Sequence, residues 1–245
     1  MNKVVLITGA SRGIGAAIAK KMASKQYNIV INYNQSEELA NNLKENLEKE
    51  HAVQVLTIKA DVSKEEEVQK MIEQTIKTFG SMDCLVNNAG ISNDCPFEDK
   101  TVENFRKVLD VNLIGAFLTS KYAAPYLMKQ ENSSIINISS TNGLNTIYPE
   151  SLDYDASKAG LISLTKNLAL QFAPSIRVNA VASGWVNTDA IKDANPKFLE
   201  EEKQKVLLKR FAEPEEIANV VSFLASEEAS YVNGEVIRVD GGFAS

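Results

Sequence analysis

The sequence is poor in histidine and cysteine, and it has no excess of positive charge. Its only histidine, His51, ends a charged stretch and is best interpreted as a surface side chain, so a catalytic triad that needs histidine is excluded. The two cysteines, Cys84 and Cys95, are too few for a disulfide framework and match no zinc-site spacing. Two free thiols are expected, as in a protein of the reducing cytoplasm.

Basic runs and long apolar runs are also missing. The chain of 245 residues carries 26 Lys and Arg against 32 Asp and Glu, a formal net charge of −6, so binding to nucleic acid or to an anionic membrane is not expected. The longest stretch without charge, residues 132–149, is rich in Asn, Ser and Thr and cannot span a bilayer. The first apolar run stops at Thr8, too soon for a signal peptide.

The sequence does contain a regular alternation of short β-branched runs with longer segments of helical period, and no linker divides it. This alternation is typical of βαβ units. It predicts an α/β fold in one domain, 1–245, with a doubly wound parallel seven-stranded sheet and helices on both faces. Strands are predicted at 4–7, 29–33, 53–59, 84–86, 135–139, 177–181 and 236–239. Helices are predicted at 13–25, 36–50, 64–79, from about 101 onward, and at 153–172 and 214–225.

One charged segment, residues 189–210, fits this rhythm poorly. Insertions at such a place often cover a site, so we treat it as a candidate substrate lid.

The first predicted strand runs directly into a glycine-rich turn, Thr8-Gly9-Ala10-Ser11-Arg12-Gly13-Ile14-Gly15, and then into a helix. Glycines let the backbone approach a pyrophosphate closely, and the amino end of a helix supplies N–H donors and a partial positive charge. A turn that needs glycine only for its backbone conformation is the alternative. The position directly after the first strand favours a dinucleotide site.

A second motif lies in the helix predicted at 153–172. Tyr154 and Lys158 are four residues apart, so both side chains project from one helix face. An ammonium group near a phenol favours the phenolate and lowers its pKa toward the working pH, which makes the tyrosine a usable general acid or base. The spacing alone is a weak signal, but here it follows a predicted strand that leads into Ser139-Ser140.

These motifs together resemble the short-chain dehydrogenase/reductase family, whose members open with Thr-Gly-x-x-x-Gly-x-Gly, and the resemblance spans essentially the whole chain. It implies a Rossmann fold and a catalytic set of Asn112, Ser140, Tyr154 and Lys158. Tyr154 would protonate a substrate carbonyl oxygen while hydride arrives from a nicotinamide, Ser140 would polarise that oxygen, and Lys158 would also hold the nicotinamide ribose.

Two members of this set have alternatives. Asn112 would position a water in a proton relay to Lys158, but a buried asparagine that bonds to backbone is the other interpretation. The family's usual spacing between serine and tyrosine points to Thr141, whereas the flanking residues favour Ser140. Both hydroxyls therefore remain candidates.

The resemblance also implies cofactor contacts outside the glycine loop. Asp61 and Val62 match the pair that receives the adenine ring, and residues 88–90 match the segment along the adenosine ribose. Ser183 replaces the family's proline in the loop that binds the carboxamide and the pyrophosphate. Asn87 has a structural interpretation, tying adjacent strands together. The expected cofactor-binding residues are Gly9, Ser11, Arg12, Gly13, Ile14, Gly15, Asp61, Val62, Asn88, Ala89, Gly90, Tyr154, Lys158, Gly184, Val186 and Thr188.

Charge near the end of the second predicted strand indicates which cofactor binds. Enzymes that prefer NAD place a carboxylate there to bind the ribose hydroxyls, but residues 31–34 contain no acid, and the first one is Glu37. Arg12 offers a cation to a 2′-phosphate, although it could also be a solvated surface side chain. NADP(H) is therefore the predicted cofactor.

Within the family, the resemblance is greatest to reductases of 3-oxoacyl thioesters carried on acyl carrier protein in bacterial fatty-acid synthesis. It implies NADPH-dependent reduction to the 3-hydroxyacyl product and a homotetramer. Two arginines associated with carrier docking align with Glu131 and Pro174, so Lys129 and Arg177 are the candidates to substitute. Alternatives are a reductase of acetoacetyl-CoA, a sugar or a small ketone, and a non-catalytic dinucleotide-binding module. No metal site is predicted.

Overall fold

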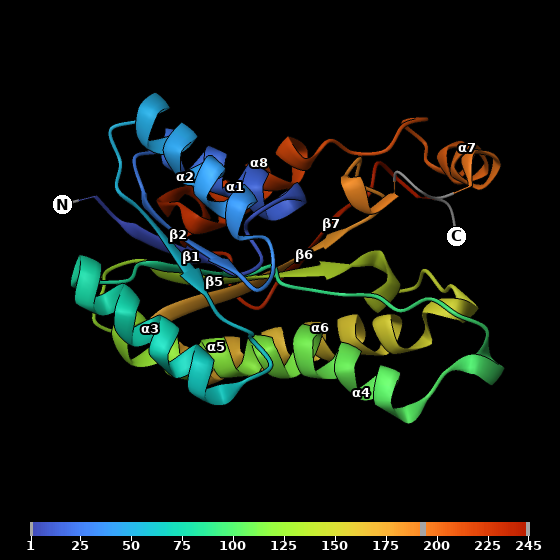
Figure 1. Ribbon diagram of the computed structural model, residues 1–245, viewed down its shortest axis with the longest axis horizontal. Coiled ribbons are helices and arrows are strands. Elements are labelled where there is room, and N and C mark those ends of the chain that lie inside the picture. Colours follow the sequence, from blue (N-terminus) through green and yellow to red (C-terminus); the bar gives the residue numbers. More distant parts are fainter. Residues whose placement is uncertain (1, 192–194, 244–245) are drawn as a thin grey trace.

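The sheet consists of seven parallel strands in the order β3-β2-β1-β4-β5-β6-β7 (Figure 1). The computed structural model describes residues 2–191 and 195–243. The strands are β1 (Val4–Ile7), β2 (Asn28–Tyr33), β3 (Val55–Lys59), β4 (Cys84–Asn87), β5 (Ser133–Ser140), β6 (Ile176–Ser183) and β7 (Val236–Val239). The predicted α/β fold is confirmed, with β5 and β6 longer at both ends than expected.

Helices cover both faces of the sheet. In Figure 1 α1, α2 and α8 lie above it and α3, α4, α5 and α6 below it, while α7 stands beyond the edge where the strands end. The helices are α1 (Gly13–Ser24), α2 (Glu37–Glu50), α3 (Glu65–Phe79), α4 (Val102–Leu109), α5 (Gly115–Leu127), α6 (Leu152–Phe172), α7 (Pro196–Lys205) and α8 (Pro214–Ala225).

Two hydrophobic cores flank the sheet, and β1 contributes to both. Val5 and Ile7 belong to the core under α1 and α8, whereas Val4 and Leu6 belong to the core over α3 and α5. Successive strand residues point to opposite faces, so a central parallel strand covered on both sides is apolar throughout. The uninterrupted apolar run 4–7 therefore reflects burial on both faces. Its end marks the edge of the sheet formed by the carboxyl ends of the strands.

A chain of buried polar side chains crosses β4, β5 and α6. Asn87 Nδ2 donates to Asn137 Oδ1 at 2.8 Å, and Asn137 Nδ2 donates to Thr165 Oγ1 at 2.8 Å. Thr119 Oγ1 on α5 donates to Asn87 Oδ1 at 2.6 Å. Each buried group is thus paired, as a low-dielectric interior requires. The geometry supports the structural interpretation of Asn87.

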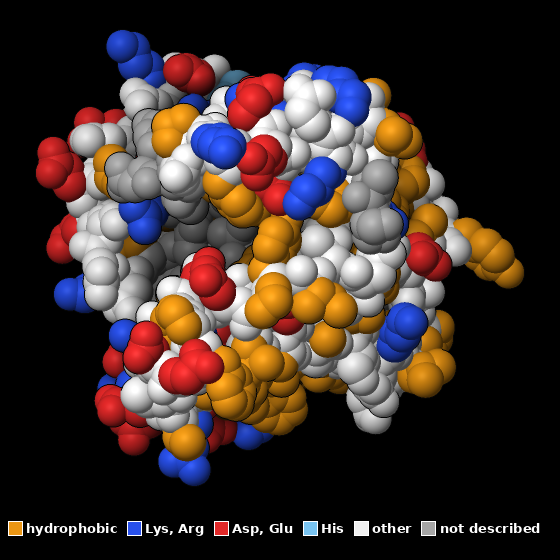
Figure 2. All heavy atoms as spheres, turned by 90° about the vertical axis from the view of Figure 1, so that its right-hand side faces the viewer, with side chains coloured by type: hydrophobic (Ala, Val, Ile, Leu, Met, Phe, Trp, Pro, Cys, Tyr) orange, Lys and Arg blue, Asp and Glu red, His pale blue; other side chains and the backbone are white. Residues whose placement is uncertain are grey.

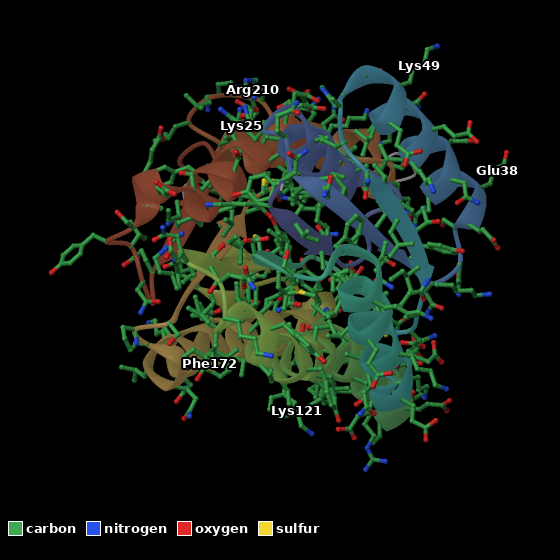
Figure 3. The ribbon with its side chains drawn as sticks, turned by 90° about the vertical axis from the view of Figure 1, so that its left-hand side faces the viewer. Lys25, Glu38, Lys49, Lys121, Phe172 and Arg210 are labelled. Atoms are coloured by element: carbon green, nitrogen blue, oxygen red, sulfur yellow. The ribbon has the colours of Figure 1, made fainter. Side chains whose placement is uncertain are left out.

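The outer faces of the helices carry the charge. Figure 3 looks at the end of the molecule opposite the candidate site, and in it Glu38 and Lys49 of α2 point away from the fold. Lys121 on α5 lies 2.8 Å from Glu65 at the start of α3. Among the described residues, no helix is both long and apolar enough to cross a membrane.

The long helix predicted from about residue 101 is wrong in one respect, because a π-helical turn, Asp110–Ile114, separates α4 from α5. The turn holds Asn112, whose side chain is bonded to the main chain of Ile91 in both directions. Such widened turns are rare and occur mostly at functional sites. The apolar period of the sequence continues through the turn, so it gives no sign of the extra residue.

The candidate lid, residues 189–210, is helical over α7 and over a short 3-10 turn, Asp189–Ile191. Residues 192–194 of this segment lie outside the described residues. Its role as a lid stays a prediction.

Candidate active site

The strand order reverses between β1 and β4, and ligands of open parallel sheets bind beyond the carboxyl ends of strands at such a point. The predicted glycine loop lies there. Gly9 and Gly13 have φ of +61° and +57°, which favour glycine. A Cβ on Gly9 would lie 2.9 Å from the Cα of Ala89, and one on Gly15 would lie 2.6 Å from Nδ2 of Asn88. At Gly9 and Gly15 the loop therefore packs against Asn88 and Ala89 too closely for a side chain.

The amino end of α1 is open to an anion. Arg12 is its N-cap residue and is exposed, no side chain caps the helix, and its first turn contains no acid. The first N–H groups of a helix lack intrahelical partners and carry partial positive charge. A Cβ on Gly13 would lie 3.6 Å from Cγ2 of Thr188, so the loop after β6 reaches this helix end. The structure thus brings together two predicted cofactor segments that are far apart in the sequence.

Thr8 and Asn32 organise the loop, and the sequence prediction missed both. The Thr8 hydroxyl accepts hydrogen bonds from the N–H groups of Asn88 and Ala89, each at 3.0 Å. Asn32 accepts from the N–H of Gly9 at 3.2 Å and donates to the carbonyl of Ala60 at 3.0 Å. The sequence did contain a signal for both residues, because each is a polar residue near the end of a buried apolar strand and needs hydrogen-bond partners there.

Asn88 serves as such a tether too. Its amide nitrogen donates to the carbonyls of Thr8 and Gly9 at 2.9 and 3.0 Å. Beyond the end of β3, at the outer edge of the sheet, Asp61 accepts from the N–H and hydroxyl of Ser63. Val62 packs on Gly115, where a Cβ would lie 2.8 Å from its Cγ2. Asp61 and Val62 therefore lie next to the π-helical turn.

The four predicted catalytic residues come from three elements that meet at the carboxyl edge. Ser140 ends β5, Tyr154 and Lys158 lie in the first part of α6, and Asn112 lies in the π-helical turn. A Cβ on Gly90 would lie 3.5 Å from both Asn112 Oδ1 and Lys158 Nζ. The structure thus places the residues next to the predicted cofactor segment 88–90.

Asn112 has its hydrogen-bonding groups occupied within the protein. Its Nδ2 donates to the carbonyl of Ile91 at 2.9 Å and to the hydroxyl of Ser157 at 3.0 Å, and its Oδ1 accepts from the N–H of Ile91 at 2.8 Å. The side chain is 1% exposed. This geometry matches the alternative in which Asn112 is a buried structural residue, and it leaves the second lone pair of Oδ1 for a further donor.

Lys158 is buried, and its Nζ donates to the carbonyl of Ile138 at 2.8 Å. It lies 5.4 Å from the centre of the Tyr154 ring. Burial penalises the charged form and lowers the pKa of Lys158 to about 8. The lysine is therefore mostly protonated at neutral pH but close to losing its proton.

The expectation that Lys158 lowers the pKa of Tyr154 is wrong for this structure. Burial of the phenol raises its pKa to about 12, a hydrogen bond with Ser140 lowers it in part, and the charges of Asp155 and Asp94 raise it. The effect of desolvation on the pKa of Tyr154 outweighs that of the lysine, because the ammonium bonds to the carbonyl of Ile138 and lies over the face of the ring. Tyr154 therefore carries its proton at neutral pH and is placed to donate it.

The loop after β6 is fixed at both ends. A Cβ on Gly184 would lie 2.7 Å from that of Asp240, and the N–H of Gly184 donates to Val239 at 3.0 Å. Val186 forms a bridge with Ala212, and Thr188 follows it. The replacement of proline by Ser183 is thus offset by contacts to β7.

A buried ion pair next to Tyr154 escaped the sequence prediction. Lys100 Nζ lies 3.0 Å from both carboxylate oxygens of Asp153, whose side chain is fully buried, and it also donates to the carbonyl of Asn93. Asp153 Oδ1 in turn accepts from the N–H of Tyr154 at 2.9 Å. The pair therefore anchors the segment after Gly90 to the first turn of α6.

One candidate for carrier docking is ruled out by its position. Arg177 is buried, and its guanidinium donates to the carbonyls of Leu224 and Ser226 at 2.9 and 3.2 Å. Desolvation lowers the pKa of Arg177. Its side chain caps the end of α8, so it cannot meet an acidic partner, whereas Lys129 is exposed over the ring of Tyr126.

Comparisons with known proteins agree with this geometry. A family model described as enoyl-(acyl carrier protein) reductase matches residues 9–244. A 3-oxoacyl-[acyl-carrier-protein] reductase of Staphylococcus epidermidis is 40% identical over 243 residues, which cover 99% of each chain. The reductase of the same name from Staphylococcus aureus is also 40% identical, over 99% of this chain and 98% of its own.

Solved structures lead to the same family. A short-chain dehydrogenase/reductase of Serratia marcescens matches with a TM-score of 0.94 and 34% identity, covering 99% of this chain and 98% of its own. A short-chain dehydrogenase of Burkholderia cenocepacia, solved in complex with NADP, matches with a TM-score of 0.92 and 31% identity over 98% and 97% of the two chains. The protein described here belongs to the short-chain dehydrogenase/reductase family and is an oxidoreductase.

Proposed function

We propose that the protein reduces the ketone of a 3-oxoacyl thioester to the 3-hydroxyacyl product, with NADPH as the hydride source. The observation that carries the proposal is the meeting of Ser140, Tyr154 and Lys158 at the sheet edge where the glycine loop opens. The curated relatives with 40% identity over the full length are named for this reaction. We also propose that the protein acts in the cytoplasm, where this reaction would take place.

The residues present fit a dinucleotide. The uncapped amino end of α1 offers N–H donors to a pyrophosphate, and Ser11, Gly13, Ile14 and Thr188 surround that end. Lys158, at the other side of the reversal point, carries an ammonium close to Gly90 for a ribose hydroxyl. The bound cofactor would supply the hydride that the protein itself lacks.

The chain's own residues would handle the proton. Tyr154 is protonated at neutral pH, so its hydroxyl can donate a proton to the ketone oxygen as negative charge develops there. Ser140, whose side chain lowers the pKa of Tyr154, would donate a second hydrogen bond to that oxygen. Lys158 would hold the nicotinamide ribose and favour the phenolate that remains. Asn112 would fix Ile91 and offer its second lone pair to a water beside Lys158.

Charge and hydrogen bonding favour NADP(H) over NAD(H). Arg12 is exposed at the N-cap of α1 and offers a cation to a 2′-phosphate. Asn32 lies near the end of β2, with an amide in place of a carboxylate. The nearest acid, Glu37, interacts with the hydroxyl of Tyr33, whose pKa is raised by burial and by that carboxylate.

The carrier of the acyl group is a separate point. Among the basic residues considered for docking, Lys129 is exposed and Arg177 is buried, so an acidic carrier protein would meet a smaller cationic surface than the family resemblance implies. This favours coenzyme A or another small thioester carrier as the second candidate. We also propose a homotetramer, since Ile114 at the end of the π-helical turn and Phe117 on α5 are each 42% exposed and apolar.

The test is NADPH oxidation with a panel of acetoacetyl groups on carrier protein and on coenzyme A, small diketones and sugars, each repeated with NADH. We expect turnover of the thioesters and a higher kcat/KM with NADPH. Turnover confined to sugars would refute the acyl-reductase proposal, and a better kcat/KM with NADH would refute the cofactor assignment.

A further inference from the structure

Helix α7 is attached to the molecule by a carboxylate. Of its ten residues, all of them described, only Glu202 is buried, with 2% of its side chain exposed. Surface helices usually dock through an apolar stripe, because a buried carboxylate is costly unless hydrogen bonds replace its water. The hydrogen-bond partners of Glu202 therefore contribute to the position of α7, together with the packing of Phe198 on Trp185.

The partners of Glu202 lie on two other segments of the site. Its Oε2 accepts from the Tyr148 hydroxyl and from Trp185 Nε1, the latter at 3.1 Å, and its Oε1 accepts from Lys205 at 2.5 Å. Desolvation raises the pKa of Glu202, but these hydrogen bonds and the charge of Lys205 lower it by more. Glu202 is thus ionised at neutral pH and fully engaged.

The same contacts assemble a set of rings around the tryptophan. The ring centre of Trp185 lies 5.9 Å from that of Tyr148, 5.8 Å from that of Phe198 and 5.7 Å from that of Phe211. We call Tyr148, Trp185, Phe198 and Phe211 the aromatic wall. Two of its contacts are edge-to-face, an arrangement that favours aromatic pairs beyond their area burial.

The aromatic wall lies next to the groups expected to carry out the chemistry. The N–H of Tyr148 donates to Asp155, the neighbour of Tyr154, and Asp155 accepts from the amide of Asn142 at 2.6 Å. Asn142 in turn bonds to the hydroxyl of Ser140 at 3.2 Å. A continuous set of hydrogen bonds therefore connects the backbone of Tyr148 to the hydroxyl of Ser140.

The position of Trp185 gives a second link. It lies between Gly184 and Val186, in the loop that follows β6, so the wall also borders the predicted cofactor segment. The loop of Tyr148 exposes further apolar surface, with Ile147 77% and Leu144 45% exposed. Figure 2 looks onto this edge of the molecule, where hydrophobic side chains gather beside a hollow in the surface.

We propose that Glu202 is a positioning residue for the substrate, which holds the aromatic wall beside Ser140 and Tyr154 so that the wall bounds the space for the acyl chain of a 3-oxoacyl substrate. The inference rests on the proposed function, because it assigns the wall to the substrate of that same site. Rings without free hydrogen-bonding groups suit an apolar chain. Glu202 bonds to Tyr148, Trp185 and Lys205, none of which is among the expected cofactor-binding residues.

Trp185 is the only tryptophan of the chain, so its fluorescence reports the wall directly. The test compares Glu202→Gln with Glu201→Gln, a matched control on the same helix whose carboxylate is exposed and 4.0 Å from Lys197. Glu202→Gln keeps the shape of the side chain but removes its charge. Measured are the KM and kcat for 3-oxobutyryl and 3-oxododecanoyl thioesters, the KM for NADPH, and the emission and acrylamide quenching of Trp185.

Loss of the charged hydrogen bonds should raise the KM for the thioesters at least ~5-fold in Glu202→Gln. The KM for NADPH should stay within about twofold of wild type, since only the substrate side is affected. The emission of Trp185 should shift to the red, and its ring should become more accessible to quenching by acrylamide. Glu201→Gln should change none of these values. Tyr148→Phe removes no charge but two hydrogen bonds, the one that Tyr148 donates to Glu202 and the one that it accepts from Trp185 Nε1. It should change the same values in the same direction, and it serves as the test if Glu202→Gln does not fold.

Failure of the proposed function and failure of this inference give different results. A wild type that reduces no 3-oxoacyl thioester refutes the proposed function, and this inference with it. An active wild type whose thioester KM is unchanged in Glu202→Gln and Tyr148→Phe refutes this inference alone, whether or not the fluorescence of Trp185 shifts. An equal rise in the KM values for thioester and NADPH also refutes it, since that indicates general loosening of the site.

Discussion

Burial fixes the charge states of the two residues expected to handle protons. The pKa of Tyr154 is raised to about 12 and that of Lys158 is lowered to about 8, in both cases chiefly by desolvation, so each neutral form is favoured. A protonated phenol is the state that a ketone reductase needs before the reaction. The lysine is the group that titrates near physiological pH.

This assignment predicts a pH dependence. Lys158 is charged below its pKa of about 8 and neutral above it, while Tyr154 stays protonated throughout this range. If the ammonium holds the ribose, kcat/KM for NADPH, which reports the free enzyme, should fall up to tenfold per pH unit above about 8. A profile that stays flat from pH 7 to 10 would contradict the role given to Lys158.

The hydroxyl that polarises the ketone can be identified by paired substitutions. The side chain of Ser140 lowers the pKa of Tyr154, whereas Thr141 begins a 3-10 turn and its carbonyl accepts from the N–H groups of Leu144, Asn145 and Thr146. Ser140→Ala should lower kcat by at least ~10², the usual loss for one oxyanion donor, and Thr141→Ala should have a much smaller effect. A larger loss for Thr141→Ala would transfer the role to Thr141.

Among the structural elements, short irregular turns align the regular ones. The π-helical turn places Asn112 against Ile91, and the 3-10 turn after β5, Thr141–Gly143, packs directly on α6. A Cβ on Gly143 would lie 2.6 Å from the carbonyl carbon of Lys158 and 2.7 Å from its oxygen. The distance between Ser140 and the helix that carries Tyr154 therefore depends on a glycine.

Gly143→Ala should for this reason affect both stability and activity. The added methyl group meets backbone and must push the turn away, at a cost of about 1–3 kcal/mol in the free energy of unfolding. The kcat should fall because Ser140 moves with the turn. Gly80→Ala is the comparison, since nothing lies within 4 Å of its added Cβ and only its φ of +77° is strained. Equal activity losses in the two variants, measured at equal folded fraction, would contradict the account.

The regular elements could be predicted from the sequence, and the turns could not. The period of the apolar residues placed β1, α8 and β7 at the ends the structure has, because burial on a sheet or a helix face repeats along the chain. The π-helical turn, the Lys100–Asp153 pair and the bond from Glu202 to Trp185 depend on segments distant in sequence. No local pattern encodes such contacts.

The candidate site divides in the same way. Motifs identified Tyr154, Lys158 and the glycine loop, and the structure brings them to one edge. The charge states of Tyr154 and Lys158 depend chiefly on burial, which the local sequence does not show. The expectation of a lowered pKa for Tyr154 was therefore wrong. Arg177 shows the same limit, because its partners Leu224 and Ser226 lie on α8 and just beyond its end, far away in the sequence.

For the molecule as a whole, the parallel sheet collects chemistry from the full length of the chain at one edge. The glycine loop follows β1, the Asn88 segment follows β4, Ser140 ends β5, and the Trp185 loop follows β6. Each lies at a carboxyl end of a strand, on either side of the point where the strand order reverses. The opposite end carries exposed charged side chains such as Lys49. This polarity brings the predicted cofactor-binding and catalytic residues together at one edge of the sheet.

At this edge a hydride from bound NADPH would reach the ketone carbon while Tyr154 supplies the proton. The most direct measurement follows the deuterium of NADPH labelled at the transferred position of the nicotinamide into acetoacetyl thioester. Wild type should yield a 3-hydroxybutyryl product with one deuterium on C3, and Tyr154→Phe should still bind NADPH but form this product at least ~10² more slowly. An unlabelled product, or a Tyr154→Phe variant as fast as wild type, would contradict the account.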